Sequence, residues 1–394
     1  MRRAWGATAA AISVVLAAAS VTGPASSATA THSTTQSATQ SATHRASHRA
    51  IHRAVRDVRP VFKEVATGLD NPRQIDFGPD GAMYVAEAGH GSFHSGSSGP
   101  CIVGGEGTAC LGATGSVTRV RHGEQHRVLT GLASLGGKTD GSFAFGPSDL
   151  VVVGKHTIVL SIGLGTDPAD RRRLHRLGRR QLAHVLAFDL RSGKRTVVGD
   201  LGAREAQVNP VGRPDSDPTG VAKAGKVGYL VTDSGANTLV RAKSGHVHGI
   251  AAFRDRGTGA RRYESVPTDV VRGPDGAWYV SELTGAPFRK GAARIWRVVP
   301  GHKPRVWATG LTNVTSLAFD GHRLYAVQIS GTGIPDYATG SLRRVYPDSS
   351  GKRSQAVAAN LFAPYGVALH RGAAYVSTCS VCYRGGTVIR IPLH

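Results

Sequence analysis

A strand pattern recurs six times along residues 61–394, and this repeat limits the possible folds more than any other feature of the sequence. Each copy opens with a turn followed by a short strand, at residues 71–77, 146–152, 217–222, 266–271, 313–319 and 363–369. A second strand with a β-branched or aromatic centre follows at residues 84–85, 158–160, 229–231, 278–280, 324–327 and 375–376. Turns such as Pro79-Asp80-Gly81 between the two strands are typical of β-hairpins.

Each copy continues beyond its hairpin. Third strands are predicted at residues 116–120, 184–188, 239–241, 294–298, 342–345 and 387–391, and fourth strands at residues 127–132 and 305–311. Four strands in each of six copies predict an all-β fold, a six-bladed β-propeller. A β-sandwich would not repeat six times, and a TIM barrel would need eight intervening helices.

The two ends of the repeat region predict how the ring closes. The last copy stops at His394 after its third strand, whereas Val61–Leu69 has the fourth-strand pattern without a copy before it. We therefore expect the N-terminal strand to complete the last blade, which removes an exposed sheet edge.

Residues 1–30 have the features of a secretory signal peptide. Arg2 and Arg3 precede an apolar run from Ala4 to Ala19, and Ala28-Thr29-Ala30 supplies the small side chains that signal peptidase requires. We place cleavage after Ala30, with Ala28 as the alternative. The run is shorter than the about 20 apolar residues of a membrane span. We expect a secreted, extracellular protein whose mature chain has no transmembrane span.

Residues 31–60 form a second compositional region, rich in Ser, Thr, Ala, His and Arg, and we expect a disordered basic linker there. The whole chain has a formal charge of +22, and residues 61–394 still carry +16. So basic a chain favours anionic partners, among them a polymer of the cell surface. Nucleic acid is not expected, because the chain is predicted to be exported and its basic segments lack interleaved aromatic residues.

Two insertions lengthen the first two copies, at about Gly89–Gly115 and after Asp167. The second holds six arginines within residues 171–180, of which Arg171, Arg172, Arg173 and Arg176 are candidates for anion binding. The alternative is the exposed face of a short helix capped by Asp167 or Asp170.

Four cysteines in an oxidising compartment are expected to pair. Local disulfides, Cys101 with Cys110 and Cys379 with Cys382, are favoured because the other pairings need distant loops to meet. Zinc binding by Cys379-Ser380-Val381-Cys382 is the alternative, although a second CxxC pair is missing from the sequence.

Carboxylates recur at equivalent positions of the copies. Second strands end in Glu87, Asp233, Glu282 and Gln328, and first strands carry Asp149 and Asp269. If the propeller brings these side chains together around its central channel, they could bind a ligand or Ca²⁺, which takes six to eight oxygen ligands. The alternative is structural, with Asp233 and its counterparts capping turns through backbone N–H groups.

The sequence after Val61 resembles the ScyD/ScyE family of secreted propellers. The motifs that carry the resemblance are Gly68–Pro72, Phe77–Gly81, Tyr84–Gly89, Ser161–Ala169, Val231–Asn237, Gly273–Phe288 and Val299–Gly301. The resemblance implies a propeller related to NHL repeats and to lactonase and sugar-dehydrogenase propellers, in a family linked by name to scytonemin gene clusters. It brings no established activity, and Cys379 and Cys382 depart from the Gly/Ser/Asn loop expected there.

We expect a module that binds an extracellular small molecule or protein without catalysis. The alternative is a Ca²⁺-dependent hydrolase of a lactone or ester, in which the metal polarises the carbonyl and a carboxylate activates water. A third possibility is a quinone-dependent sugar dehydrogenase with His90 and His94 as acid and base.

Overall fold

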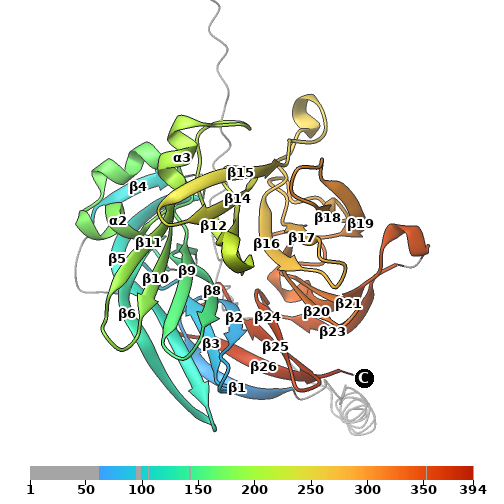
Figure 1. Ribbon diagram of the computed structural model, residues 1–394, viewed down its shortest axis with the longest axis horizontal. Coiled ribbons are helices and arrows are strands. Elements are labelled where there is room, and N and C mark those ends of the chain that lie inside the picture. Colours follow the sequence, from blue (N-terminus) through green and yellow to red (C-terminus); the bar gives the residue numbers. More distant parts are fainter. Residues whose placement is uncertain (1–61, 95–98, 105, 142, 352, 394) are drawn as a thin grey trace, which may run out of the picture. The chain divides into compact units, whose positions relative to one another are not determined.

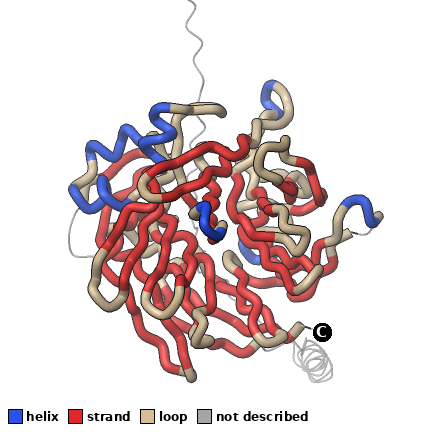
Figure 2. The backbone as a smooth tube through the Cα atoms, in the orientation of Figure 1, coloured by secondary structure: helices blue, strands red, loops and turns tan. Residues whose placement is uncertain are grey.

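The structure is a computed structural model that describes residues 62–393, except 95–98, 105, 142 and 352. The predicted signal peptide and linker, residues 1–30 and 31–60, therefore lie outside the described residues. A compact unit that includes Glu64–His394 contains all the sheets, and Figure 2 shows that strands dominate it. Within the described residues, no helix is long and apolar enough to cross a membrane.

Six antiparallel sheets form the blades, as the repeat predicts. Blade 1 contains β2 (Pro72–Phe77), β3 (Met83–Glu87), β5 (Gly107–Arg121) and β6 (Glu124–Gly137), extended by β4 (Cys101–Gly104) and β7 (Ala144–Phe145). Blade 2 contains β8 (Pro147–Val153), β9 (Thr157–Ile162), β10 (His184–Asp189) and β11 (Arg195–Asp200). Blade 3 contains β12 (Pro218–Lys223), β13 (Tyr229–Asp233), β14 (Thr238–Lys243) and β15 (His246–Ala252).

The remaining blades follow the same plan. Blade 4 contains β16 (Pro267–Arg272), β17 (Trp278–Glu282), β18 (Ala293–Val298) and β19 (Arg305–Leu311). Blade 5 contains β20 (Val314–Asp320), β21 (Arg323–Gln328), β22 (Gly340–Val345) and β23 (Gln355–Leu361). Blade 6 contains β24 (Val367–His370), β25 (Ala373–Thr378), β26 (Gly386–Pro392) and β1 (Lys63–Leu69). The sheet order β1-β26-β25-β24 confirms the predicted closure by the N-terminal strand.

In the part of the chain that the structure describes, helices occur only between strands. The longer ones in the described residues are the 3-10 helix η1 (Pro168–Arg173), α2 (Arg176–Gln181) and α3 (Leu201–Gln207). Single 3-10 turns are η2 (Gly225–Val227), η3 (Gly259–Arg261), η4 (Tyr337–Thr339) and η5 (Asp348–Ser350). Asp167 caps η1 by accepting a hydrogen bond from the Ala169 amide at 2.8 Å, as the capping alternative predicted.

The first strands of the blades line the axis of the ring, where each contacts the first strands of both neighbouring blades (Figure 1). Aspartates on the first strands connect three of these neighbouring pairs. Asp76 on β2 accepts a hydrogen bond from the Val152 amide of β8 at 2.8 Å. Asp149 on β8 and Asp269 on β16 accept from the Val221 and Leu317 amides of the next blades, at 2.6 and 2.7 Å. These aspartates therefore hold adjacent blades together.

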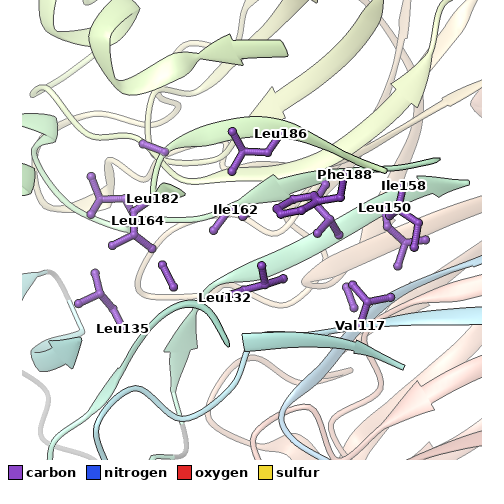
Figure 3. Packing of buried hydrophobic residues seen from close by; sticks show 14 of the residues in the cluster. Val117, Leu132, Leu135, Leu150, Ile158, Ile162, Leu164, Leu182, Leu186 and Phe188 are labelled. Atoms are coloured by element: carbon purple, nitrogen blue, oxygen red, sulfur yellow. The ribbon is translucent and has the colours of Figure 1, made fainter. Parts of the chain in front are cut away.

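Apolar side chains fill the spaces between blades, as Figure 3 shows for blades 1 and 2. Leu132 of β6 and Val117 of β5 belong to one buried cluster with Leu150 of β8 and Ile158 of β9. Each such fully buried side chain contributes about 1.5–3 kcal/mol to folding. Because both faces of a blade are covered in this way, the second strands are apolar at nearly every position.

Replacing Leu69 by Ala tests the ring closure. Leu69 is fully buried in β1, within the cluster that joins blade 6 to blade 1, so the change should lower the free energy of unfolding by about 2–4 kcal/mol. Thr67→Ala, at an exposed position of the same strand, should change it by less than about 0.5 kcal/mol. Denaturant unfolding monitored by tryptophan fluorescence measures both, and equal effects would contradict a closing role for β1.

Candidate functional site

The carboxylates predicted at the ends of the second strands lie on one face of the ring, each in its own blade. Antiparallel register places the end of each second strand beside the start of the first strand, as in the pairs Pro72 with Glu87 and Pro218 with Asp233. Pro267 with Glu282 and Val314 with Gln328 repeat the arrangement. We call this the top face, defined by the residues at which the first strands begin.

On the top face, Glu87, Asp233 and Glu282 are buried and held by separate partners. Glu87 accepts hydrogen bonds from the Asp70 amide and Arg127, both at 2.7 Å. Asp233 accepts from the Asp217 amide at 2.7 Å and the Ala236 amide at 3.2 Å. Glu282 accepts from Arg256 at 2.7 Å and Trp296 at 2.6 Å. Asp233 thus caps the turn that follows its strand through the Ala236 amide, whereas Glu282 bonds two side chains, one of them from the connection that precedes its blade.

Asp149 and Asp269 lie on the axis, where they make the blade-to-blade bonds described above. Burial and repulsion by Asp269 raise the pKa of Asp149 well above its usual range. Burial also raises the pKa of Asp269, to about 6. These two aspartates do not join Glu87, Asp233 and Glu282 in one ring of ligands. Among the described residues, no group of three or more His, Cys, Asp or Glu side chains is placed to hold a metal ion.

Of the four arginines predicted to bind anions, Arg171 lies in a different environment from the rest. Its guanidinium bonds Asp200 at 2.8 Å, beside His184, and its side chain is only 13% exposed. Burial alone would raise the pKa of Asp200, but His184 and Arg171 lower it to about 2. Arg171 is therefore part of a structural ion pair, whereas Arg172, Arg173 and Arg176 are exposed.

The two insertion histidines occupy different environments. His90 is buried and its Nδ1 bonds the Asp70 carboxylate. His94 is exposed and stacks on Tyr383, with ring centroids 5.7 Å apart. Burial raises the pKa of Asp70, and the His90 ring offsets part of that effect. These contacts dock the first insertion against the Cys379–Cys382 loop, and they do not form an exposed acid and base pair.

Both predicted disulfides are present, Cys101–Cys110 and Cys379–Cys382. The first joins β4 to β5 directly, because Cys101 and Cys110 are partners in the strand register. It fixes the hairpin formed by β4 and the start of β5, which lies within the first predicted insertion.

An open pocket of about 820 Å³ is formed where this hairpin meets the loops of blades 2 and 3. We call it the acidic pocket; its lining residues are Val103, Gly104, Thr166, Asp167, Val211, Gly212, Arg213, Pro214, Asp215, Gly235, Asn237, Asp255, Arg262 and Glu264. A smaller pocket of about 480 Å³ shares Val211, Gly212, Asp255 and Arg262 with it. The two together give a groove wide enough for a small organic molecule.

Carboxylates outnumber cations in the acidic pocket. Four lining residues are acidic, namely Asp167, Asp215, Asp255 and Glu264, and two are basic, Arg213 and Arg262. Arg262 is paired with Asp255 at 2.8 Å. Burial and repulsion by Asp233 and Glu264 raise the pKa of Asp215 to about 7. Burial and repulsion by Asp233 likewise raise the pKa of Asp217 well above its usual range. Four acidic and two basic side chains therefore line the pocket, and part of the negative charge develops only as the pH rises through about 7.

Glu205 extends this cluster into the interior. It is 1% exposed, and neither of its carboxylate oxygens accepts a well-formed hydrogen bond from a described residue. Burial, followed by repulsion from Asp233, raises its pKa to about 8, although the nearby Asp215 amide offsets part of the rise. Asp215 Oδ1 is likewise buried without a described partner. Two buried acids with unbonded oxygens are costly for the fold.

The local sequence explains why Glu205 is buried. Asp200 caps α3 by accepting from the Ala203 amide at 2.8 Å, which fixes the phase of the helix. Leu201 packs into the core, and Glu205 lies four residues later on the same helix face. Beyond α3, Gly235 leaves room for Asp215, because a Cβ there would come within 2.5 Å of Asp215 Oδ1.

Sequence reasoning missed Glu205, Asp215, Asp217, Asp255 and Glu264. They lie in α3 and in the connections between blades, outside the repeated strands from which the candidates were chosen. One sequence feature could have indicated them. Residues 200–217 contain four acidic residues, although the chain as a whole is basic.

Solved structures similar to this chain share little of its sequence. No family model and no curated protein matches the chain. A streptogramin B lyase is 12% identical, covering 84% of this chain and 96% of that one with a TM-score of 0.45. A glucose dehydrogenase-type oxidoreductase from Thermus thermophilus is 17% identical, covering 83% and 98% with a TM-score of 0.48. The PQQ-bound aldose sugar dehydrogenase of Streptomyces coelicolor is 17% identical, covering 64% and 78% with a TM-score of 0.41. At these values the fold assignment depends on the six sheets themselves: the chain is a six-bladed β-propeller.

Replacing Glu205 by Gln tests the buried acid. The pKa of Glu205 is about 8 in the folded state, so folding favours its protonated form. The resulting contribution to stability is fully present only below the pKa that Glu205 has in the unfolded chain. That contribution is lost as the pH rises through 8. Glu205→Gln should therefore leave stability at pH 5 nearly unchanged and raise it by about 1–3 kcal/mol at pH 8.5.

Denaturant unfolding across this pH range measures the effect, with Glu124→Gln at an exposed position as the control. A variant whose stability followed the wild-type pH profile would show that Glu205 is ionised in the folded protein.

Proposed function

We propose that this protein is an extracellular binding module whose acidic pocket takes a cationic organic molecule. The observation that carries the proposal is the excess of carboxylates over cations in an open pocket of about 820 Å³. The chain as a whole has a formal charge of +22, so an acidic pocket stands out against its net charge. A ligand with an ammonium or guanidinium group would supply the missing positive charge.

The apolar part of the lining supports an organic ligand. Val103, at the hairpin tip, is 71% exposed, and Pro214 and Val211 lie on the wall formed by the loop after α3. An exposed valine beside carboxylates suits a ligand that joins a positive charge to a hydrocarbon body. The two disulfides and the predicted signal peptide support a site of action outside the cell.

Equilibrium binding tests the proposal directly. Isothermal titration with spermidine and with agmatine should show saturable binding, and the uncharged 1,4-butanediol should not bind. The double variant Asp215→Asn with Glu264→Gln should bind the cations about 10- to 100-fold more weakly, because two charge-assisted contacts are lost. Asp320→Asn with Asp348→Asn makes the same change of charge away from the pocket and should bind normally. The proposal is wrong if neither cation binds, or if the two double variants lose affinity equally.

The pH dependence of binding provides an independent prediction. Because the pKa of Asp215 is about 7, a cation should bind its ionised form and displace a proton. Affinity should rise between pH 6 and pH 8, with proton release in titrations run in buffers of different ionisation enthalpy. In Asp215→Asn the rise should be much smaller, whereas an unchanged profile would place the titrating group elsewhere.

The hairpin disulfide should influence the same affinity. Cys101→Ser with Cys110→Ser removes the covalent link that holds Val103 and Gly104 at the pocket wall, so the wall becomes less preorganised. We expect the cation to bind about 3- to 10-fold more weakly. Cys379→Ser with Cys382→Ser, in a loop that does not line the pocket, is the matched control and should keep wild-type affinity in the same titration.

A further inference from the structure

The arginines that follow Asp170 form an exposed basic surface on η1 and α2. Residues 171–180 contain six arginines and no acidic residue. Arg171 is held by Asp200, but the other five are exposed: Arg172, Arg173, Arg176, Arg179 and Arg180. We call these five residues the arginine surface.

Few acidic side chains neutralise the charges of the arginine surface. Arg173 contacts Asp170 at 3.4 Å while its own side chain is 73% exposed, and so exposed a pair is weak. Asp170 also accepts a hydrogen bond from Thr166 at 3.3 Å, and Asp167 is used to cap η1. The nearby acids therefore leave most of the positive charge available.

The backbone beneath these arginines is firmly anchored. Leu174 and Leu182 belong to the buried cluster between blades 1 and 2. Gln181 is 5% exposed and accepts a hydrogen bond from the Ala133 amide of β6 at 3.0 Å. Gly178 packs against this cluster so closely that a Cβ would lie 2.9 Å from the Leu174 side chain. The arginines thus extend into solvent from a support that is fixed to the propeller.

The spacing of the charges suits a chain of anions better than a single small anion. Arg176 and Arg180 are one helical turn apart, which is about 6 Å along the axis, and Arg179 lies between them on the helix. A single phosphate or carboxylate can engage one or two guanidinium groups bidentately. Five guanidinium groups in nine residues can be neutralised together only by a ligand that carries several anionic groups.

We propose that the arginine surface binds an extended polyanion of the cell envelope, a polymer with a phosphate or carboxylate on each repeating unit. The surface is separate from the acidic pocket, since none of its five arginines lines that pocket. Polymer binding would hold the propeller near the cell surface and leave the pocket free for its cationic ligand. Association should be fast and strongly dependent on salt.

Binding to two immobilised polymers tests the proposal and identifies the source of the anion. Linear polyphosphate supplies the phosphate and polygalacturonate the carboxylate, with inorganic phosphate as the monomeric competitor. The mature chain should bind at least one polymer, and inorganic phosphate at the same anion concentration should not displace it. Replacing all five arginines by Gln should reduce the slope of log affinity against log salt by about 3 to 4.

A charge-matched variant separates this surface from net charge. Five exposed arginines on other parts of the ring are replaced by Gln in this control: Arg195, Arg272, Arg305, Arg323 and Arg371. Its salt slope should fall by less than about 1. Arg179→Gln with Arg180→Gln, at two exposed positions of α2, should give an intermediate loss if the fivefold variant does not fold. Equal losses in the two fivefold variants, or no binding to either polymer, would overturn the proposal.

Discussion

The ring depends on hydrogen bonds made between neighbouring blades by carboxylates of the first strands. Asp76, Asp149 and Asp269 each bond the amide of the next blade's first strand. A carboxyl group without such donors would be costly in this environment, because a polar group removed from water needs hydrogen-bond partners. The same strands bury apolar side chains between the blades, so the polar and apolar requirements of each interface are met together. Other interfaces use hydroxyls, as where Ser234 bonds the Pro267 carbonyl at 2.6 Å.

The sequence predicted the fold well because the architecture is repetitive. A strand pattern that recurs six times specifies the blades, and the unmatched pattern of Val61–Leu69 specifies the closure. The local cysteine pairs were also predictable, since short separations limit the choice of partner. In each case, the determining information lies in residues close together in sequence or in copies that can be compared.

The candidate site could not be predicted in the same way. Burial of Glu205 depends on the phase of a single short helix, and the pKa of Asp215 depends on Asp233 and Glu264 from other segments. Equivalent positions such as Glu87 and Glu282 were recognisable in sequence, but their roles depend on Arg127 and Arg256, which pair with them in space. Likewise, adjacent arginines that look alike in sequence divide into Arg171, which is paired, and Arg172, which is exposed. Loops between blades have no repeat against which such differences stand out.

Closure by β1 also has a consequence for the order of folding. The strand at Lys63–Leu69 must wait for its partner at Gly386–Pro392, about 320 residues later in the chain. During synthesis, five blades can be assembled while the sixth still lacks its inner three strands. Contacts so distant in sequence form slowly because a long segment must be restrained to make them. The circular arrangement therefore delays completion of the native state until β26 has been made, so an emerging chain remains an open arc for most of its synthesis.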